Sequence, residues 1–263
     1  MSKALSKGQY TAILVAVLCF SILYLGFDIK PKSQKNLEKS RSLNIEATSI
    51  QNLVLEAREV LGPDYNVLEA LNMELNSIEI DSIKVEKLKS ISSKWYELGF
   101  PAISGYYAEE VAKILETADS WSVAGTTYLI GAREAEKEKT KTWSFNRAIR
   151  SLETAISLDP KNLDNKINLA LGFIDNPPSD NPMKGILQLR DLNEKFPDNV
   201  KVLSQLGRLS LVTNQVENAL KRLKRAEELD PENKTVICLL AEAYNAAGQA
   251  GLAQTYNDKC FNN

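Results

Sequence analysis

The fold is decided by a stretch of 33 residues, 200–232, which reads VKVLSQLGRLSLVTNQVENALKRLKRAEELDPE. Its apolar and small residues recur at intervals of three and four, so they share one face of each of two successive helices. These residues are Leu203, Leu206 and Gly207 in the first helix and Ala219, Leu223 and Ala226 in the second. The glycine and alanines let two antiparallel helices approach closely, and the leucines fill the seam. The stretch predicts a helical hairpin that Pro231 closes.

The spacing resembles a tetratricopeptide repeat (TPR), whose 34-residue pattern is W-x2-L-G-x2-Y, then A-x3-F, then P. Leu203 stands at the Trp position and Leu223 at the Phe position, whereas Ser210 replaces the Tyr. An earlier stretch, Trp121-x2-Ala124-Gly125-x2-Tyr128, follows the first-helix pattern more closely still. Its second helix carries Ala148, Leu152, Ala155 and Pro160.

The resemblance covers residues 85–263. It implies an all-α fold, a right-handed superhelix of antiparallel helix hairpins in the manner of a TPR-like α-solenoid, with one uninterrupted apolar core. Five units are expected, near residues 85–117, 118–162, 163–199, 200–233 and 234–263. Two insertions depart from the period. The charged stretch 131–146 is expected to lengthen two helices as a solvated extension, with packing of Trp143 and Phe145 beneath it, or a knob that contacts a partner, as the alternatives. The proline-rich stretch 175–184 is expected to form a loop.

Residues 34–84 precede the repeats and predict two more helices, 37–61 and 64–82. Gly62-Pro63 should end the first, and Asp64 is placed to cap the second. The second would face inward with Val67, Leu68, Leu71, Leu75 and Ile78. These helices could form an isolated hairpin, a linker or an atypical cap of the array, and we favour the cap because their apolar stripes need a partner surface.

Residues 1–33 are expected to hold a short tail, a transmembrane helix and the start of a basic linker. Residues 10–27, YTAILVAVLCFSILYLGF, form an uncharged run close to the roughly 20 residues that span a bilayer. A cleaved signal peptide is disfavoured because no small-x-small pair follows the run, and a lipoprotein is excluded because Leu18 precedes Cys19. We therefore expect a single-pass membrane protein, of a bacterial inner membrane in our interpretation.

Charge leaves the side of the membrane open. The net charge is −2, but residues 1–41 carry seven basic and two acidic side chains. The basic residues after the anchor favour a cytoplasmic repeat domain, whereas the basic tail before it suits an anchor with its N-terminus inside. The near-neutral total gives no electrostatic case for binding nucleic acid.

The family resemblance implies protein–protein binding on the concave surface, which the first helix of each unit lines. The expected partner is an extended or helical peptide segment, held by a membrane-tethered scaffold or adaptor. A structural role in an envelope or cell-wall assembly, without a defined peptide ligand, is the alternative. The candidate groove residues are Asp119, Ser122, Thr126, Leu129, Asp164, Ile167, Leu171, Ile174, Lys201, Ser204, Arg208, Leu211, Thr235, Cys238, Glu242 and Asn245.

Catalysis finds no support in the composition. The chain has no histidine, which removes His-based triads and His-containing metal sites, and it has no glycine-rich phosphate loop. We expect no enzyme activity, no cofactor and no metal. Cys238 and Cys260 flank one hairpin, yet their repeat positions point to the groove and to the helix seam, so free thiols are expected.

Overall fold

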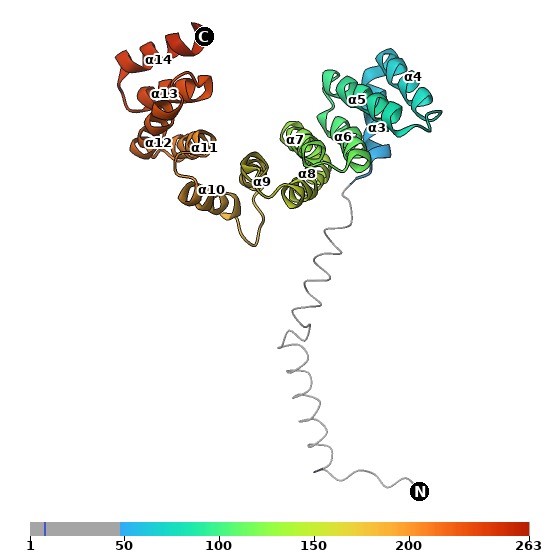
Figure 1. Cartoon of the computed structure of the whole chain (residues 1–263), viewed down its shortest axis with the longest axis horizontal. Coiled ribbons are helices and arrows are strands. Elements are labelled where there is room, and N and C mark those ends of the chain that lie inside the picture. The colour runs from blue at the N-terminus through green and yellow to red at the C-terminus, as the bar shows by residue number, and fades with distance from the viewer. Residues whose placement is uncertain (1–7, 9–47, 263) are drawn as a thin grey trace. The chain divides into compact units, whose positions relative to one another are not determined.

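The structure is a computed structural model that describes Gly8 and residues 48–262 (Figure 1). The chain divides into two units, Met1–Glu46 and Ala47–Asn263. Every regular element within residues 48–262 is helical. Among these residues, no helix is both long enough and apolar enough to cross a bilayer. The predicted anchor, residues 10–27, lies outside the described residues.

Ten helices pair into five successive antiparallel hairpins (Figure 1). They are α5 (Asp81–Glu97) with α6 (Pro101–Leu115), α7 (Ala118–Glu134) with α8 (Glu138–Leu158), α9 (Leu163–Asp175) with α10 (Lys184–Lys195), α11 (Val200–Val212) with α12 (Val216–Leu229), and α13 (Lys234–Ala246) with α14 (Ala250–Asn262). Each hairpin also contacts the next, and first helices meet across units, as α7 meets α9 and α11 meets α13. The expected all-helical hairpin fold is confirmed.

Two helices precede the hairpins, α3 (Ile50–Leu61) and α4 (Tyr65–Leu75), joined by the 3-10 turn Gly62–Asp64. Gly62 ends α3 with a positive φ of 53°, as expected. Three details of the prediction are wrong. The predicted helix 37–61 does not run through Thr48 and Ser49, because Ser49 is extended and caps a helix that begins at Ile50. Asp64 makes no side-chain capping bond, because the turn runs directly into α4 and the Tyr65 amide donates to the carbonyls of Gly62 and Pro63. The second helix also ends at Leu75 rather than near residue 82, and Val67 on it is exposed.

The charged insertion lengthens α7 to 17 residues and α8 to 21, compared with 13 and 14 in α11 and α12. Trp143 is buried beneath it with its ring edge-on to Tyr128 at 5.5 Å, and Phe145 meets Phe173 at 6.0 Å. These contacts confirm that the aromatic residues pack under the extension. The region after α9 up to Lys184 holds no helix, which agrees with the expected loop.

The buried core forms four clusters rather than the single uninterrupted one that was expected. The largest cluster contains residues from every helix from α3 to α8. Separate clusters lie in the α9–α11 and α11–α14 regions. The first helices α9 and α11 bury polar side chains, Asn165 and Ser210, among their apolar positions. The apolar contacts are therefore divided between neighbouring hairpins.

Asn165 leads to the first prediction, which is that Asn165→Val stabilises the protein by about 1 kcal/mol. Its side chain is fully buried, and neither amide atom has a hydrogen-bond partner among the described residues. Val202 and Val236 hold the same place in α11 and α13, three residues after a capping asparagine, and both are fully buried. Urea denaturation measures the change. A destabilised valine variant would show that the amide has a partner that stabilises the fold.

Candidate functional site

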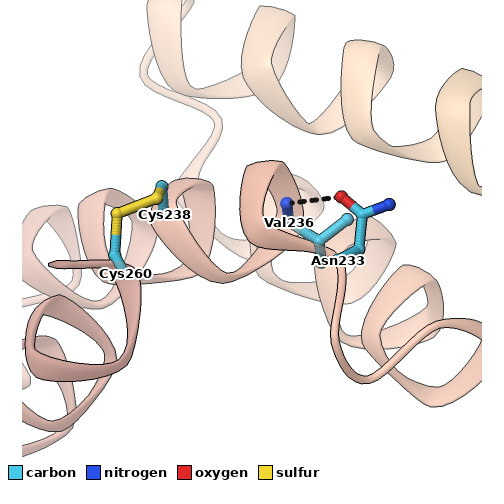
Figure 2. Close-up of a disulfide and its surroundings, with 4 residues drawn as sticks. All are labelled: Asn233, Val236, Cys238 and Cys260. Carbon is cyan, nitrogen blue, oxygen red and sulfur yellow. Dashed lines mark hydrogen bonds between the residues drawn. A yellow bond between two sulfur atoms is a disulfide. The ribbon is translucent and has the colours of Figure 1, made fainter. Parts of the chain in front are cut away.

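The candidate site is a hollow of about 360 Å³ formed by the first helices α9 and α11 and the start of α13, which we call the first-helix hollow. All three helices begin in the same way. Asn162, Asn199 and Asn233 each accept a hydrogen bond from the backbone amide three residues on, at 3.2, 3.0 and 3.2 Å. Figure 2 shows the last of these caps, from Val236 to Asn233. Because the three helices share the same cap, residues at the same distance from the capping asparagine lie on the same side of each helix. These residues line one surface.

The hollow combines apolar side chains with amide and charged groups. Its lining residues are Asp164, Ile167, Asn168, Leu171, Val200, Lys201, Ser204, Gln205, Asn233 and Thr235. Lys201 donates to Asp164 at 2.6 Å and so joins α11 to α9 across one side. Both side chains are more than half exposed, so this pair adds little stability and its groups are accessible to a partner.

The structure brings six of the predicted groove residues together in the hollow: Asp164, Ile167, Leu171, Lys201, Ser204 and Thr235. Asp119 lines a different hollow, which α5, α6 and α7 form, with Leu115 and Val123. Leu129 is a buried core residue, Ile174 packs beside Gly185, and Leu211 packs against the α11–α14 cluster. Arg208 bonds to Gln205 at 3.2 Å. Ser122 and Thr126 are half-buried on α7, and Glu242 and Asn245 are exposed on α13.

Sequence reasoning missed Asn168 and Gln205, which line the hollow beside the predicted Ile167 and Ser204. Each lies one residue after a residue of the predicted stripe. The face that α9 and α11 turn toward the hollow therefore includes positions 168 and 205 as well as positions 167 and 204. The signal was present in the sequence as two amide side chains at equivalent places, 37 residues apart, in successive units.

The expectation of free thiols is wrong, because Cys238 and Cys260 form a disulfide between α13 and α14 (Figure 2). Their Cα atoms are 5.1 Å apart, within the usual range for a disulfide. In an antiparallel hairpin, residues equally distant from the turn face each other, and each cysteine lies eleven positions from Gln249. Cys238 is therefore a structural residue, and its thiol is not available as a nucleophile.

A half-buried ionic cluster joins α6, α7 and α8. We call Glu109, Lys113, Tyr128 and Arg147 the Glu109 cluster. The Glu109 carboxylate accepts hydrogen bonds from the Tyr128 hydroxyl at 2.7 Å and from Arg147 at 2.8 Å, and it pairs with Lys113 at 3.0 Å. Burial alone would raise the pKa of Glu109, but the Tyr128 hydrogen bond and the charge of Arg147 outweigh it and hold this pKa below its ordinary value.

The second prediction follows from this lowered pKa. Ionised Glu109 stabilises the fold above its ordinary pKa of 4.5, and that contribution disappears as the pH falls through the lower pKa of the folded state. Glu109→Gln should therefore lower the free energy of unfolding by about 1–3 kcal/mol at pH 7, with a smaller difference at pH 3. Urea denaturation at both pH values measures this. Glu110→Gln, which removes only the outer partner of Lys113, is the control. A pH-independent difference would contradict the assignment.

The register of the hairpins settles the architecture. A Cβ atom on Gly125 would lie 2.7 Å from Leu152, and one on Gly207 would lie 2.7 Å from Leu223, so each glycine lets its first helix approach the second at the same place. These are the glycine and aromatic positions of the repeat pattern. The described part of the chain is a TPR-like array of helical hairpins.

Comparisons with known proteins give structural likeness only. No protein-family profile and no curated protein sequence matches the chain. Similar solved structures include MamA, at 17% identity over 68% of this chain and 90% of that chain with a TM-score of 0.42, and a MamA structure of AMB-1, at 19% over 68% and 91% with 0.38. YrrB, described as a TPR protein with an unusual peptide-binding site, matches at 14% over 70% and 92% with 0.38.

Proposed function

We propose that this protein is a membrane-tethered scaffold that binds a segment of a partner protein in the first-helix hollow. The observation that carries the proposal is the composition of that hollow. Leu171 and Val200 are half-buried and offer apolar contact, while Asn168 and Gln205 offer amide donors and acceptors that suit the main chain of a peptide. We propose a non-catalytic role as well, which the lack of histidine and of a glycine-rich phosphate loop in the sequence supports.

Tethering is assigned to residues 10–27, on the sequence argument alone. The disulfide helps to decide on which side of the membrane the repeats lie, because disulfides form and persist in oxidising compartments. We place the repeats on the oxidising, extracytoplasmic side, with the short basic tail inside. The basic residues that follow the anchor do not exclude this, since long domains are translocated largely regardless of their charge.

Paired variants in the intact protein test the binding proposal. Asn168→Arg combined with Gln205→Arg introduces two long cationic side chains into the hollow. The matched control, Gln254→Arg with Asn257→Arg, makes the same changes on exposed positions of α14. Cross-linked pull-downs should lose their specific partners with the first pair and keep them with the second. Equal partner recovery from both folded variants would contradict the proposal and favour a structural role without a peptide ligand.

A thiol assay on protein denatured directly from cells tests the compartment. On the oxidising side, denatured full-length protein should react with a maleimide polymer only at Cys19, because Cys238 and Cys260 are paired. Prior reduction should add two further modifications. Three accessible thiols without reduction would place the repeats in a reducing compartment.

A further inference from the structure

A second hollow, of about 490 Å³, lies where the charged insertion meets the N-terminal helix α3, and we call it the insertion hollow. The insertion lengthens α7 and α8, so the connection between them reaches α3, which packs beside α6 (Figure 1). Lys137 of this connection donates to the Glu56 carboxylate of α3 at 2.9 Å, and Lys139 bonds to the same carboxylate. These two ion pairs join two walls of the hollow.

The floor of the insertion hollow is apolar. Leu53, Ala57 and Ile103 line it and are buried in the largest core cluster. Phe100 is half-buried and Val60 is 78% exposed, so both leave apolar surface that a ligand can cover. An apolar side chain of a partner is therefore favoured here, because it removes this surface from water.

The rim carries an excess of carboxylates. Glu59, Glu134 and Glu136 line the hollow and are exposed, and within residues 48–262 none of them takes part in an ion pair or a side-chain hydrogen bond. Among the described residues that line the hollow, Lys137 is the basic one, and it is already paired with Glu56. The lining therefore holds four carboxylates and one ammonium group, a net charge of −3.

The backbone adds to this preference for cations. α7 ends in the hollow at Glu134, and the last carbonyl groups of a helix have no partner within it. In α6 and α8 the residue after the helix donates its N–H to such a carbonyl, whereas Ala135 makes no such bond among the described residues. These carbonyls form the negative end of the helix dipole, where lysine and arginine bind favourably. The nearby start of α6 offers little to an anion, since Pro101 has no N–H and the Ile103 N–H donates to the Phe100 carbonyl.

We propose that the insertion hollow binds a segment of a partner protein in which apolar side chains alternate with lysine or arginine. An apolar side chain of that segment lies against Val60 and Phe100, and its cations pair with the rim carboxylates and the open end of α7. The opposite net charges also favour the encounter of the two proteins. The insertion hollow shares no lining residue with the first-helix hollow and does not depend on the function proposed for it.

A pair of short peptides provides the probe. The acetylated and amidated pentapeptide KLRLK has the proposed chemistry, and ELQLE keeps its leucines but reverses its charge. In calorimetric titrations of the full-length protein at low ionic strength, KLRLK should bind, with an affinity that falls as salt is added, and ELQLE should not. The rim variant, Glu134→Gln with Glu136→Gln, should weaken KLRLK binding about fivefold or more, because it removes two unpaired carboxylates.

Two further variants separate the charged contribution from the apolar one. The control variant, Glu153→Gln with Glu194→Gln, removes two exposed carboxylates of α8 and α10 that lie outside the hollow, and it should bind within about twofold of the parent. Val60→Ser keeps every charge but removes accessible apolar surface, and it should weaken binding about threefold. The substituted side chains are all exposed, so the variants should keep the Tm of the parent.

Four results would overturn the proposal. They are no binding of KLRLK, equal binding of ELQLE, equal weakening in the rim and control variants, and unchanged affinity in Val60→Ser, which would reduce the effect to general attraction between charges. A concentration-dependent dimer of the free protein that the rim variant fails to form would instead assign the hollow to a second copy of this chain. The variant Asn168→Arg with Gln205→Arg should still bind KLRLK, so the two hollows are tested separately.

Discussion

Removing the Cys238–Cys260 disulfide is expected to lower the free energy of unfolding of the C-terminal hairpin by about 3 kcal/mol. The bridge closes a loop with a sequence separation of 22 residues. The helix that it holds, α14, buries only Ala253 among the residues whose side chains are described. Half-buried Tyr256 adds a ring contact with Tyr244 at 5.1 Å and a hydrogen bond to Glu227 at 2.8 Å. The array therefore depends on a covalent link at the hairpin where its apolar contacts are sparse.

Hydrogen exchange of α13 and α14 in the double variant Cys238→Ser with Cys260→Ser measures this effect. Reductant should produce the same change in the parent protein and no further change in the variant. Cys19→Ser, which leaves the bridge intact, is the control. Unaltered protection after reduction would show that helix packing alone holds the terminal hairpin.

Substitution of Gly185 by alanine is expected to destabilise the protein by about 1–3 kcal/mol. A Cβ atom at this position would overlap the carbonyl oxygen of Ala170 and lie 2.8 Å from the backbone nitrogen of Ile174. The obstacle is the backbone of α9, which cannot rotate away as a side chain could. The α9–α10 hairpin would have to open slightly, which would also disturb the adjacent first-helix hollow.

The same substitution at Gly251 provides a matched control of opposite sign. Both glycines are the second residue of a second helix, but a Cβ at Gly251 meets nothing within 4 Å. Gly251→Ala should stabilise by up to about 1 kcal/mol through helix propensity. Thermal and urea denaturation of the two variants measure both effects. A neutral Gly185→Ala would show that α9 and α10 approach less closely than described.

The helical hairpins could be predicted from the sequence because small residues at fixed spacing carry a local meaning. On the apolar face of an amphipathic helix, small residues such as Gly207, Ala219 and Ala226 indicate close contact with another helix. All three are buried in the structure. The packing of Trp143 beneath the insertion was only one of the alternatives that the sequence left open, and its burial decides between them.

What could not be predicted depends on rotation about a helix axis or on pairing across a turn. Ser204, which was expected to line the hollow, and Gln205, which was not, are consecutive residues of α11. A small rotation of the helix about its axis decides how far each one faces the hollow. The pairing of Cys238 with Cys260 depends on which residue lies at the centre of the turn between α13 and α14. The repeat positions alone do not determine that residue.

Binding of a partner segment in the first-helix hollow is the central claim, and site-specific photo-cross-linking tests it most directly. A photoreactive residue at position 205 of the full-length protein, irradiated in cells, should yield discrete adducts with a partner protein. The same group at position 257 on α14 should yield none of them. Adducts that form equally from both positions, or only from position 257, would contradict the account.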